Sequence, residues 1–243
     1  MRSWLTPATE EAFDAKVTDI CQLYQDAPAL AAQGERVAST EELTGVQALE
    51  RLHPGLPWAP GKVERREFEY IRHGTGTFII SRDVVSGHIV APSCGTTRTA
   101  AAFLAHVPGV VATEPTAARW HFVVDNLDIH RSASLVRYVA ALSGLEGDLG
   151  EQGKRGILHN RQSRAAFLSD PCHRLVFHYT PKHCSWLNQV EIWLSIIVRK
   201  LLTRGSFTSG EDLIAKVQRF IEYYNRTMAQ PFRWTSQGKP LVA

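Results

Sequence analysis

The chain has 243 residues, of which 44% are hydrophobic and 21% are charged, as in globular proteins with a sizeable core. Its formal charge of +3 is only weakly basic, so a nucleic-acid-binding surface would have to come from local clusters of Lys and Arg. No apolar run approaches the roughly 18 residues that span a bilayer, and the opening residues do not resemble a leader peptide. We therefore expect a cytoplasmic protein with no membrane partner.

Hydrophobic periodicity divides the chain into a leading helix and a longer body. Residues 10–24 carry apolar residues at helical spacing, and we expect residues 1–35 to form an N-terminal helix and linker. Residues 36–243 then form one α/β domain. Its predicted strands cover residues 36–49, 75–84, 88–92, 120–125 and 174–180. Its predicted helices cover residues 97–106, 132–142, 185–200 and 209–225.

The order of these elements predicts a mixed five-stranded sheet with helices on both faces. Three consecutive strands with short connections indicate an antiparallel meander, and the later alternation with helices indicates parallel crossovers. Between the first two strands, residues 54–62 form a loop punctuated by proline and glycine. A glycine-rich, basic insertion around residues 144–165 precedes the last strand.

Two acidic residues stand at positions where function is a strong explanation. Asp125 ends the apolar strand WHFVVD, and catalysts gather beyond the carboxyl ends of such strands. It is equally suited to a turn or to capping the next helix. Glu191 falls within the apolar stripe of the helix at 185–200, where a carboxylate loses its hydration unless a cation or donors compensate. Glu191 therefore requires a positive partner.

Glu41 and Glu42 lie midway along the first predicted strand, although glutamate is disfavoured in strand interiors. Alternation directs one of them to each face of the sheet. The favoured interpretation is an edge strand with solvated charge, and the other brings one glutamate into the same buried acidic site. His130 and Asp128 are expected to be loop residues rather than catalysts.

Four blocks of the sequence, in order, resemble segments of one family. They begin STEELTGVQAL, FVVDNLDIHRSASLVR, YTPKHCSWLNQVEIWLSIIVRK and YYNRTMAQPFRWT. Together they are similar to the catalytic domain of bacterial insertion-sequence transposases of the mariner-related superfamily. The combination of VDN after a strand with SWLNQVE at the start of a helix gives the resemblance its specificity. It implies a ribonuclease H-like fold and an acidic D-D-E triad, with Asp125 as the second acid and Glu191 as the third.

The resemblance further implies two divalent ions, Mg²⁺ or Mn²⁺, bound by Glu41, Asp125 and Glu191 as catalytic and metal-binding residues. The implied function is metal-dependent DNA strand cleavage and strand transfer in transposition. The family pattern has aspartate where this chain has Glu41, and the extra methylene moves the carboxylate by up to about 1.5 Å. The alternative expectation is a catalytically impaired or truncated remnant that only binds DNA or a partner chain.

The partner implied by the resemblance is double-stranded DNA, as transposon ends and as target. In the insertion, phosphate contacts are favoured over simple solvation for Lys154, Arg155, Arg161 and Arg164. Lys182, His183 and Asn188 are further DNA-binding candidates, although His183 and Asn188 also suit structural roles. Bringing two ends together favours a homodimer by analogy. Recognition of the ends is expected to depend on a separately encoded helix-turn-helix segment, because no such pair of helices precedes residue 36.

Overall fold

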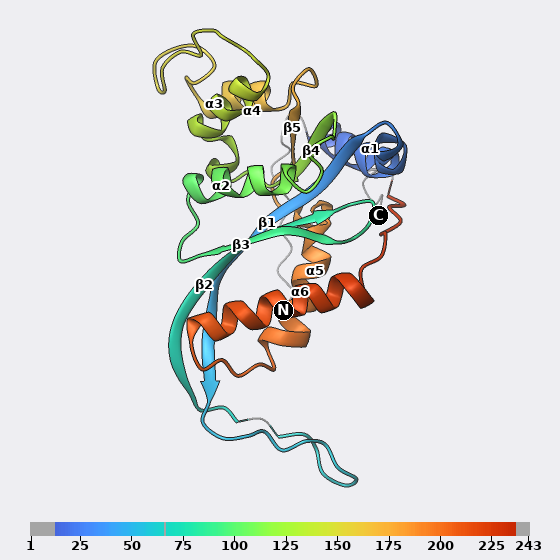
Figure 1. The fold of residues 1–243 in the computed structure, drawn as a ribbon, viewed down its shortest axis with the longest axis vertical. Coiled ribbons are helices and arrows are strands. Elements are labelled where there is room, and N and C mark those ends of the chain that lie inside the picture. The colour runs from blue at the N-terminus through green and yellow to red at the C-terminus, as the bar shows by residue number, and fades with distance from the viewer. Residues whose placement is uncertain (1–12, 66, 237–243) are drawn as a thin grey trace.

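The computed structural model describes residues 13–65 and 67–236. One mixed sheet lies at its centre, with the strand order β3-β2-β1-β4-β5 (Figure 1). Strands β1 and β2, and β2 and β3, pair antiparallel, whereas β4 runs parallel to both β1 and β5. The strands are β1 (Glu35–Arg51), β2 (Tyr70–Asp83), β3 (Ile89–Gly95), β4 (Arg119–Val124) and β5 (Leu175–Tyr179). The predicted mixed five-stranded sheet is confirmed.

Helices cover both faces of this sheet, as predicted. On one face the buried aromatic side chains of β4 and β5 pack against α2 (Ala100–Val111), α3 (Ala133–Leu142) and α4 (Arg161–Leu168). The opposite face is covered by α1 (Phe13–Ala32), α5 (Val190–Ile197) and α6 (Gly210–Thr227), and Figure 1 shows the strands between the two sets. Among the described helices, none combines the length and apolar character needed to cross a bilayer.

Three elements differ from the sequence prediction. The leading helix continues to Ala32 with Pro28 inside it, and residues 10–12 of the prediction lie outside the described part. The insertion contains α4, whose start is fixed by a capping box in which Asn160 and Ser163 bond reciprocally to each other's backbone N–H. The helix predicted from residue 185 begins only at Val190, after the 3₁₀ turn η2 (Ser185–Leu187), and ends in the π-helical turn η3 (Val198–Leu202).

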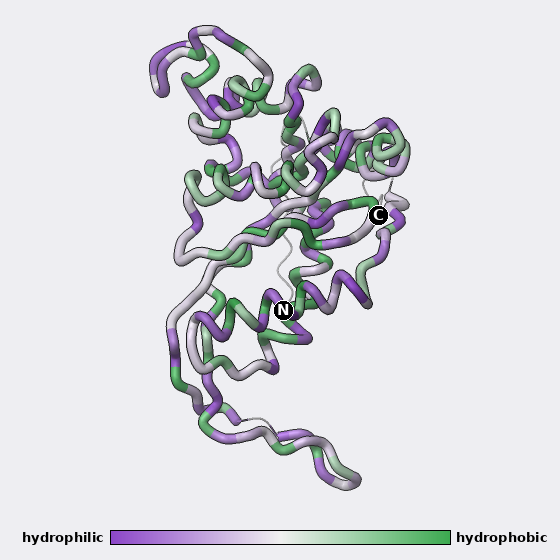
Figure 2. The backbone as a smooth tube through the Cα atoms, in the orientation of Figure 1, coloured by the Kyte–Doolittle hydropathy of each residue, from purple (hydrophilic) through white to green (hydrophobic). Residues whose placement is uncertain are grey.

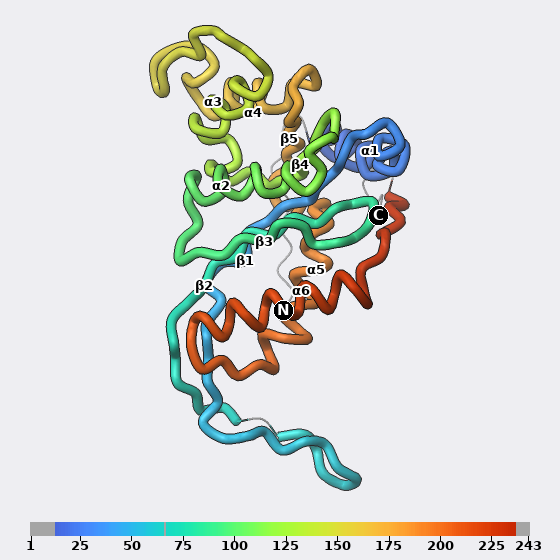
Figure 3. The backbone as a smooth tube through the Cα atoms, viewed as in Figure 1, coloured from blue at the N-terminus to red at the C-terminus, as the bar shows by residue number. Residues whose placement is uncertain are grey.

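Beyond the body of the molecule, β1 and β2 lead into an arm made of residues 52–65 and 67–69, seen as paired tubes in Figure 3. Two isolated β-bridges, Leu56 with Arg65 and Ala59 with Lys62, hold its two sides together. Figure 2 shows apolar and polar segments mixed along the arm, and Trp58 and Phe68 are largely exposed on it. The prediction of a simple loop at residues 54–62 was therefore incomplete. These residues form the tip of an extended hairpin.

A buried polar chain links α2 to the sheet. His106 of α2 is almost fully buried, with Nε2 2.8 Å from Ser81 Oγ and Nδ1 2.9 Å from Ser93 Oγ. Ser81 Oγ also lies 2.7 Å from Thr40 Oγ1 on the central strand. Burial lowers the pKa of His106 to about 4, so the ring is neutral in the native protein near neutral pH.

We expect this histidine to make the protein less stable in mild acid. Between pH 6.5, where the unfolded side chain titrates, and about 4, the unfolded chain binds a proton that the folded chain does not. Stability therefore falls as the pH falls through this window, by roughly 3 kcal/mol in total. Urea unfolding at several pH values should show a steeper pH dependence for the unchanged chain than for His106→Gln. Equal slopes for the two proteins would contradict the prediction.

Candidate active site

A cavity of about 380 Å³ opens beyond the carboxyl ends of β4 and β5. The three acids named from the sequence all line it: Glu41 from β1, Asp125 directly after β4, and Glu191 from the first turn of α5. Lys182 and His183, two of the DNA-binding candidates, line the same cavity on the segment after β5. The structure thus brings together residues that are up to 150 positions apart in the chain.

The sheet register places Glu41 beside Asp125. Ser39 of β1 pairs with Val123 of β4 in the parallel ladder, so the residues two positions further along each chain are level with each other. Side chains alternate along a strand, so Glu41 lies on the same face as Val37, which is the face covered by α1 and α5. Two neighbouring strands therefore present carboxylates side by side on one face.

The start of α5 is fastened to the central strand through Asn188. Its Nδ2 donates to the carbonyl oxygen of Thr40 and to Glu41 Oε2, both at 3.0 Å, and its Oδ1 accepts from Ser39 Oγ. Ser39 Oγ in turn accepts from the backbone N–H of Val190 at 2.8 Å. These bonds fix the turn that carries Glu191. The side chain of Asn188 is buried and used inside the protein, so we do not retain it as a DNA contact.

The charge of Asp125 acts unfavourably on both of the other acids. Burial, reinforced by the negative charges of Asp125 and Glu42, raises the pKa of Glu41 to about 7. Burial and the charge of Asp125 also raise the pKa of Glu191. Burial acts in the same direction on Asp125, but hydrogen bonds from His130 and the Leu127 N–H outweigh it and lower its pKa. The cavity is therefore a site of concentrated negative charge that a cation would stabilise.

Sequence reasoning missed two residues behind this cavity, Glu42 and His130. The expectation of an edge strand with solvated charge was wrong, because β1 is the central strand of the sheet. Glu42 is buried on the face opposite Glu41, and its Oε1 lies 2.9 Å from His130 Nε2. His130, expected in a loop, lies in the 3₁₀ turn η1 (Asp128–Arg131); it is fully buried and its Nδ1 lies 2.8 Å from Asp125 Oδ1.

Comparison with known proteins agrees with this geometry. A family model described as DDE superfamily endonuclease matches residues 44–214, which include Asp125 and Glu191 and begin shortly after Glu41. The chain belongs to the DDE superfamily of endonucleases. A search of curated proteins finds no match to this DDE-superfamily chain.

Solved structures with a similar fold are those of the Mos1 mariner transposase. The Mos1 mariner paired end complex with Mn matches with a TM-score of 0.54 and 12% identity over 93% of this chain and 61% of that one. The Mos1 transposase paired-end complex with left transposon end matches with a TM-score of 0.54 and 11% identity, over 96% of this chain and 60% of that one. The catalytic domain of Mos1 mariner transposase matches with a TM-score of 0.52 and 10% identity, over 92% of this chain and 90% of that one. This DDE-superfamily chain thus has the ribonuclease H-like transposase fold and spans about three fifths of the proteins in the two complexes.

The donors of the DDE-superfamily chain fit a hard divalent cation. Carboxylate oxygens are the ligands that Mg²⁺ and Mn²⁺ prefer, and the partly buried acids Glu41, Asp125 and Glu191 would gain a counter-ion. Among the described residues, no group of three or more His, Cys, Asp and Glu side chains is arranged to hold a metal directly. Mg²⁺ usually keeps several waters and uses one or two carboxylates, so this looser arrangement suits it.

The basic insertion presents less positive charge to solvent than its sequence suggests. Three of its cations are exposed but form ion pairs with acids: Lys154 with Glu151, Arg155 with Asp148, and Arg161 with Asp128. Arg164 is buried, and its guanidinium donates to the carbonyl oxygens of Arg131 and Leu158 at 2.7 and 2.9 Å. Arg164 therefore holds the insertion to the body rather than facing solvent.

Proposed function

We propose that this chain is the catalytic part of a transposase that cleaves DNA strands and transfers them to a target with divalent metal ions. The observation that carries the proposal is the convergence of Glu41, Asp125 and Glu191 on one open cavity, two of them level with each other in the sheet. The family match to endonucleases supports phosphodiester chemistry. The fold shared with Mos1 transposase supports transposition as its setting.

When bound, a pair of Mg²⁺ or Mn²⁺ ions would stabilise the attacking and leaving oxygens of a displacement at phosphorus. The chain's own residues hold the three carboxylates in place for this. Asn188 Nδ2 fixes one oxygen of Glu41 at 3.0 Å, and the bonds of Ser39 fix the helical turn that bears Glu191. Asp125 uses Oδ1 for internal hydrogen bonds, and among the described residues nothing bonds to its Oδ2. Asp125 thus keeps one carboxylate oxygen available toward the cavity.

Double-stranded DNA, as transposon ends and target, is the proposed partner. Lys182 and His183 line the cavity, and we propose that they contact the phosphates next to the scissile bond. The exposed Lys154, Arg155 and Arg161 would contact DNA more weakly and in a salt-dependent way, since acids already pair with them. A homodimer, a separately encoded helix-turn-helix segment and a location in the cytoplasm at the nucleoid complete the proposal.

A nicking assay tests the proposal. The purified chain is incubated with supercoiled plasmid, and with duplexes carrying the element's ends, in Mg²⁺, in Mn²⁺ or in excess EDTA. We expect nicking that requires the divalent ion and prefers duplex DNA. Cleavage that persists in EDTA, or a preference for RNA–DNA hybrids over duplexes, would refute a metal-dependent transposase in favour of another nuclease.

A further inference from the structure

The carboxylate of Asp125 is held asymmetrically. Its Oδ1 accepts from His130 Nδ1 at 2.8 Å and from the Leu127 backbone N–H at 2.9 Å. Among the described residues, Oδ2 has no hydrogen-bond or ion-pair partner, while the side chain lines the cavity. One oxygen is thus committed to the protein, and the other is left for a ligand in the cavity.

His130 is itself fixed on every side. Its Nε2 bonds to Glu42 Oε1 at 2.9 Å, and its ring packs against Phe103 with 4.4 Å between ring centroids. The Tyr179 hydroxyl donates to the His130 carbonyl oxygen at 3.0 Å. Both ring nitrogens face carboxylate oxygens, which only accept hydrogen bonds, so both nitrogens are donors. These contacts fix the orientation of the His130 ring, and its Nδ1–H in turn fixes the position of Asp125 Oδ1.

Burial of the Glu42 carboxylate costs the fold stability. Its side chain is fully buried, and its Oε2 has no hydrogen-bond partner among the described residues. Burying a carboxylate with one oxygen unsatisfied is unfavourable. A fold that needed only packing here would be better served by apolar side chains in place of the buried Glu42–His130 pair. The position of Glu42 under His130 therefore points to a role in the site.

We infer that Glu42 and His130 are positioning residues that orient Asp125, so that its Oδ2 is presented to the divalent ion. The inference rests on the proposed metal-dependent function and adds two residues to it. Protein groups that hydrogen-bond to a metal ligand set its orientation, and their loss typically weakens metal binding about 10- to 100-fold. Glu42 acts on Asp125 only through the histidine ring.

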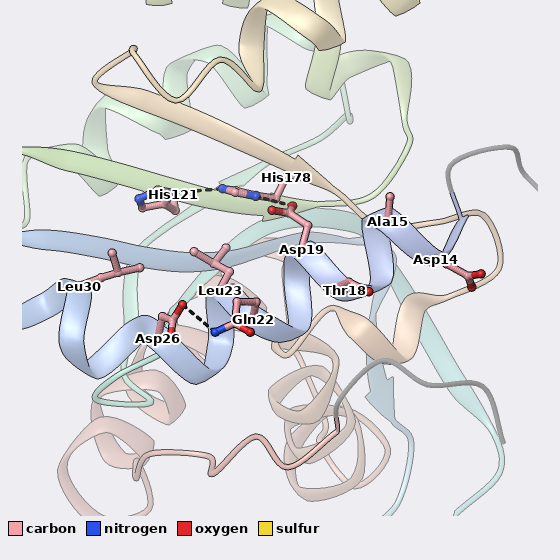
Figure 4. Close-up of a pocket in the computed structure, with 10 residues that line it drawn as sticks. All are labelled: Asp14, Ala15, Thr18, Asp19, Gln22, Leu23, Asp26, Leu30, His121 and His178. Atoms are coloured by element: carbon pink, nitrogen blue, oxygen red, sulfur yellow. Dashed lines mark hydrogen bonds and ion pairs between the residues drawn. The ribbon is translucent and has the colours of Figure 1, made fainter.

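A second carboxylate–imidazole chain on the same sheet provides a matched control. There Glu35 Oε2 lies 2.7 Å from His121 Nε2, His121 Nδ1 lies 3.0 Å from His178 Nε2, and His178 Nδ1 lies 2.7 Å from Asp19. Figure 4 shows His121, His178 and Asp19 in line beside α1. Glu35 starts the same strand that carries Glu42 but is not part of the acidic cavity. Glu35→Gln therefore removes a comparable charge without touching Asp125.

The test measures Mn²⁺ binding to the full chain, with the free Mn²⁺ quantified by electron paramagnetic resonance. Thermal unfolding of each variant is measured in parallel. His130→Asn retains a donor at the Nδ1 position facing Asp125, and His130→Gln retains one only at the Nε2 position facing Glu42. We expect His130→Gln to weaken Mn²⁺ binding about tenfold or more, and His130→Asn to stay within about threefold. Glu42→Leu, which removes the acceptor facing His130 Nε2 and leaves the ring free to turn, should weaken binding as His130→Gln does, whereas Glu35→Gln should not.

Wild-type Mn²⁺ affinity in His130→Gln and Glu42→Leu would overturn the inference. So would equal losses in the two His130 variants that follow their loss of thermal stability, because that pattern indicates a purely structural role. Failure of the unchanged chain to bind Mn²⁺ would be a different result. It would refute the metal site itself, and with it both the proposed function and the roles given to Glu42 and His130.

Discussion

Asp125→Asn is expected to abolish metal-dependent nicking while leaving the fold intact. The amide oxygen of asparagine can still accept from His130 Nδ1 and from the Leu127 N–H, so the internal bonds of the side chain survive. The negative charge and the free carboxylate oxygen are lost. We expect the nicking rate to fall at least about a thousandfold, which corresponds to ~4 kcal/mol of transition-state stabilisation. A plasmid nicking time course in Mg²⁺, with circular dichroism as the check on folding, measures the effect.

Asp128→Asn is the matched control for that substitution. Asp128 lies three residues further along the same segment, is exposed, and forms an ion pair with Arg161. Removing this surface charge should change the nicking rate by less than a factor of about three. If Asp125→Asn nicks DNA as fast as the Asp128 variant, Asp125 is not a metal ligand, and the cavity is not the active site.

Glu41→Asp should increase nicking about a hundredfold. The glutamate carboxylate extends to Asn188 Nδ2, and shortening the side chain by one methylene withdraws it by up to about 1.5 Å. A displacement near 1 Å changes rates in a well-organised site by about a hundredfold. The aspartate restores the residue type of the resembling family at a position level with Asp125. Initial nicking rates in Mg²⁺ for the two proteins provide the measurement.

Glu50→Asp, the same shortening near the other end of β1, controls for general effects on the strand. An unchanged or lower rate for Glu41→Asp would show that glutamate suits this site, and the interpretation of the chain as an impaired remnant would lose its main support. A rise of the expected size would establish that the unchanged chain is a weakened catalyst.

The sheet could be predicted because each strand carries its own signal. WHFVVD and RLVFHYT are apolar runs bounded by polar residues, and the turn at Ser86-Gly87 separates β2 from β3. The late start of α5 could not be read from periodicity. The buried Leu187 belongs to the 3₁₀ turn η2, yet it continues the apolar spacing of the helix. The helix begins only after Asn188, whose side chain donates to the Thr40 carbonyl oxygen of β1. Local patterns do not show where a polar side chain finds a distant partner.

The site was only partly accessible from the sequence for the same reason. Glu191 stands out in an apolar stripe and Asp125 at a strand end, so each could be named from its neighbours. Whether Glu41 or Glu42 faces the cavity depends on the register between β1 and β4, which is a tertiary property. The role of His130 depends on Glu42, 88 residues earlier in the chain. Arg164 was misjudged because its partners are backbone carbonyl groups, which no sequence pattern marks.

The central position of β1 has a consequence for how this protein tolerates insertions and deletions. A slip of one residue against β4 would reverse the sides of all its residues at once. Glu42 would then face the open cavity, and Glu41 would face the buried layer beneath α2. Adjacent glutamates on this strand are thus not spare copies of one another: loss of a single residue upstream would bring Glu42 to the cavity position and leave Leu43, which cannot bond to His130, at the position that Glu42 held.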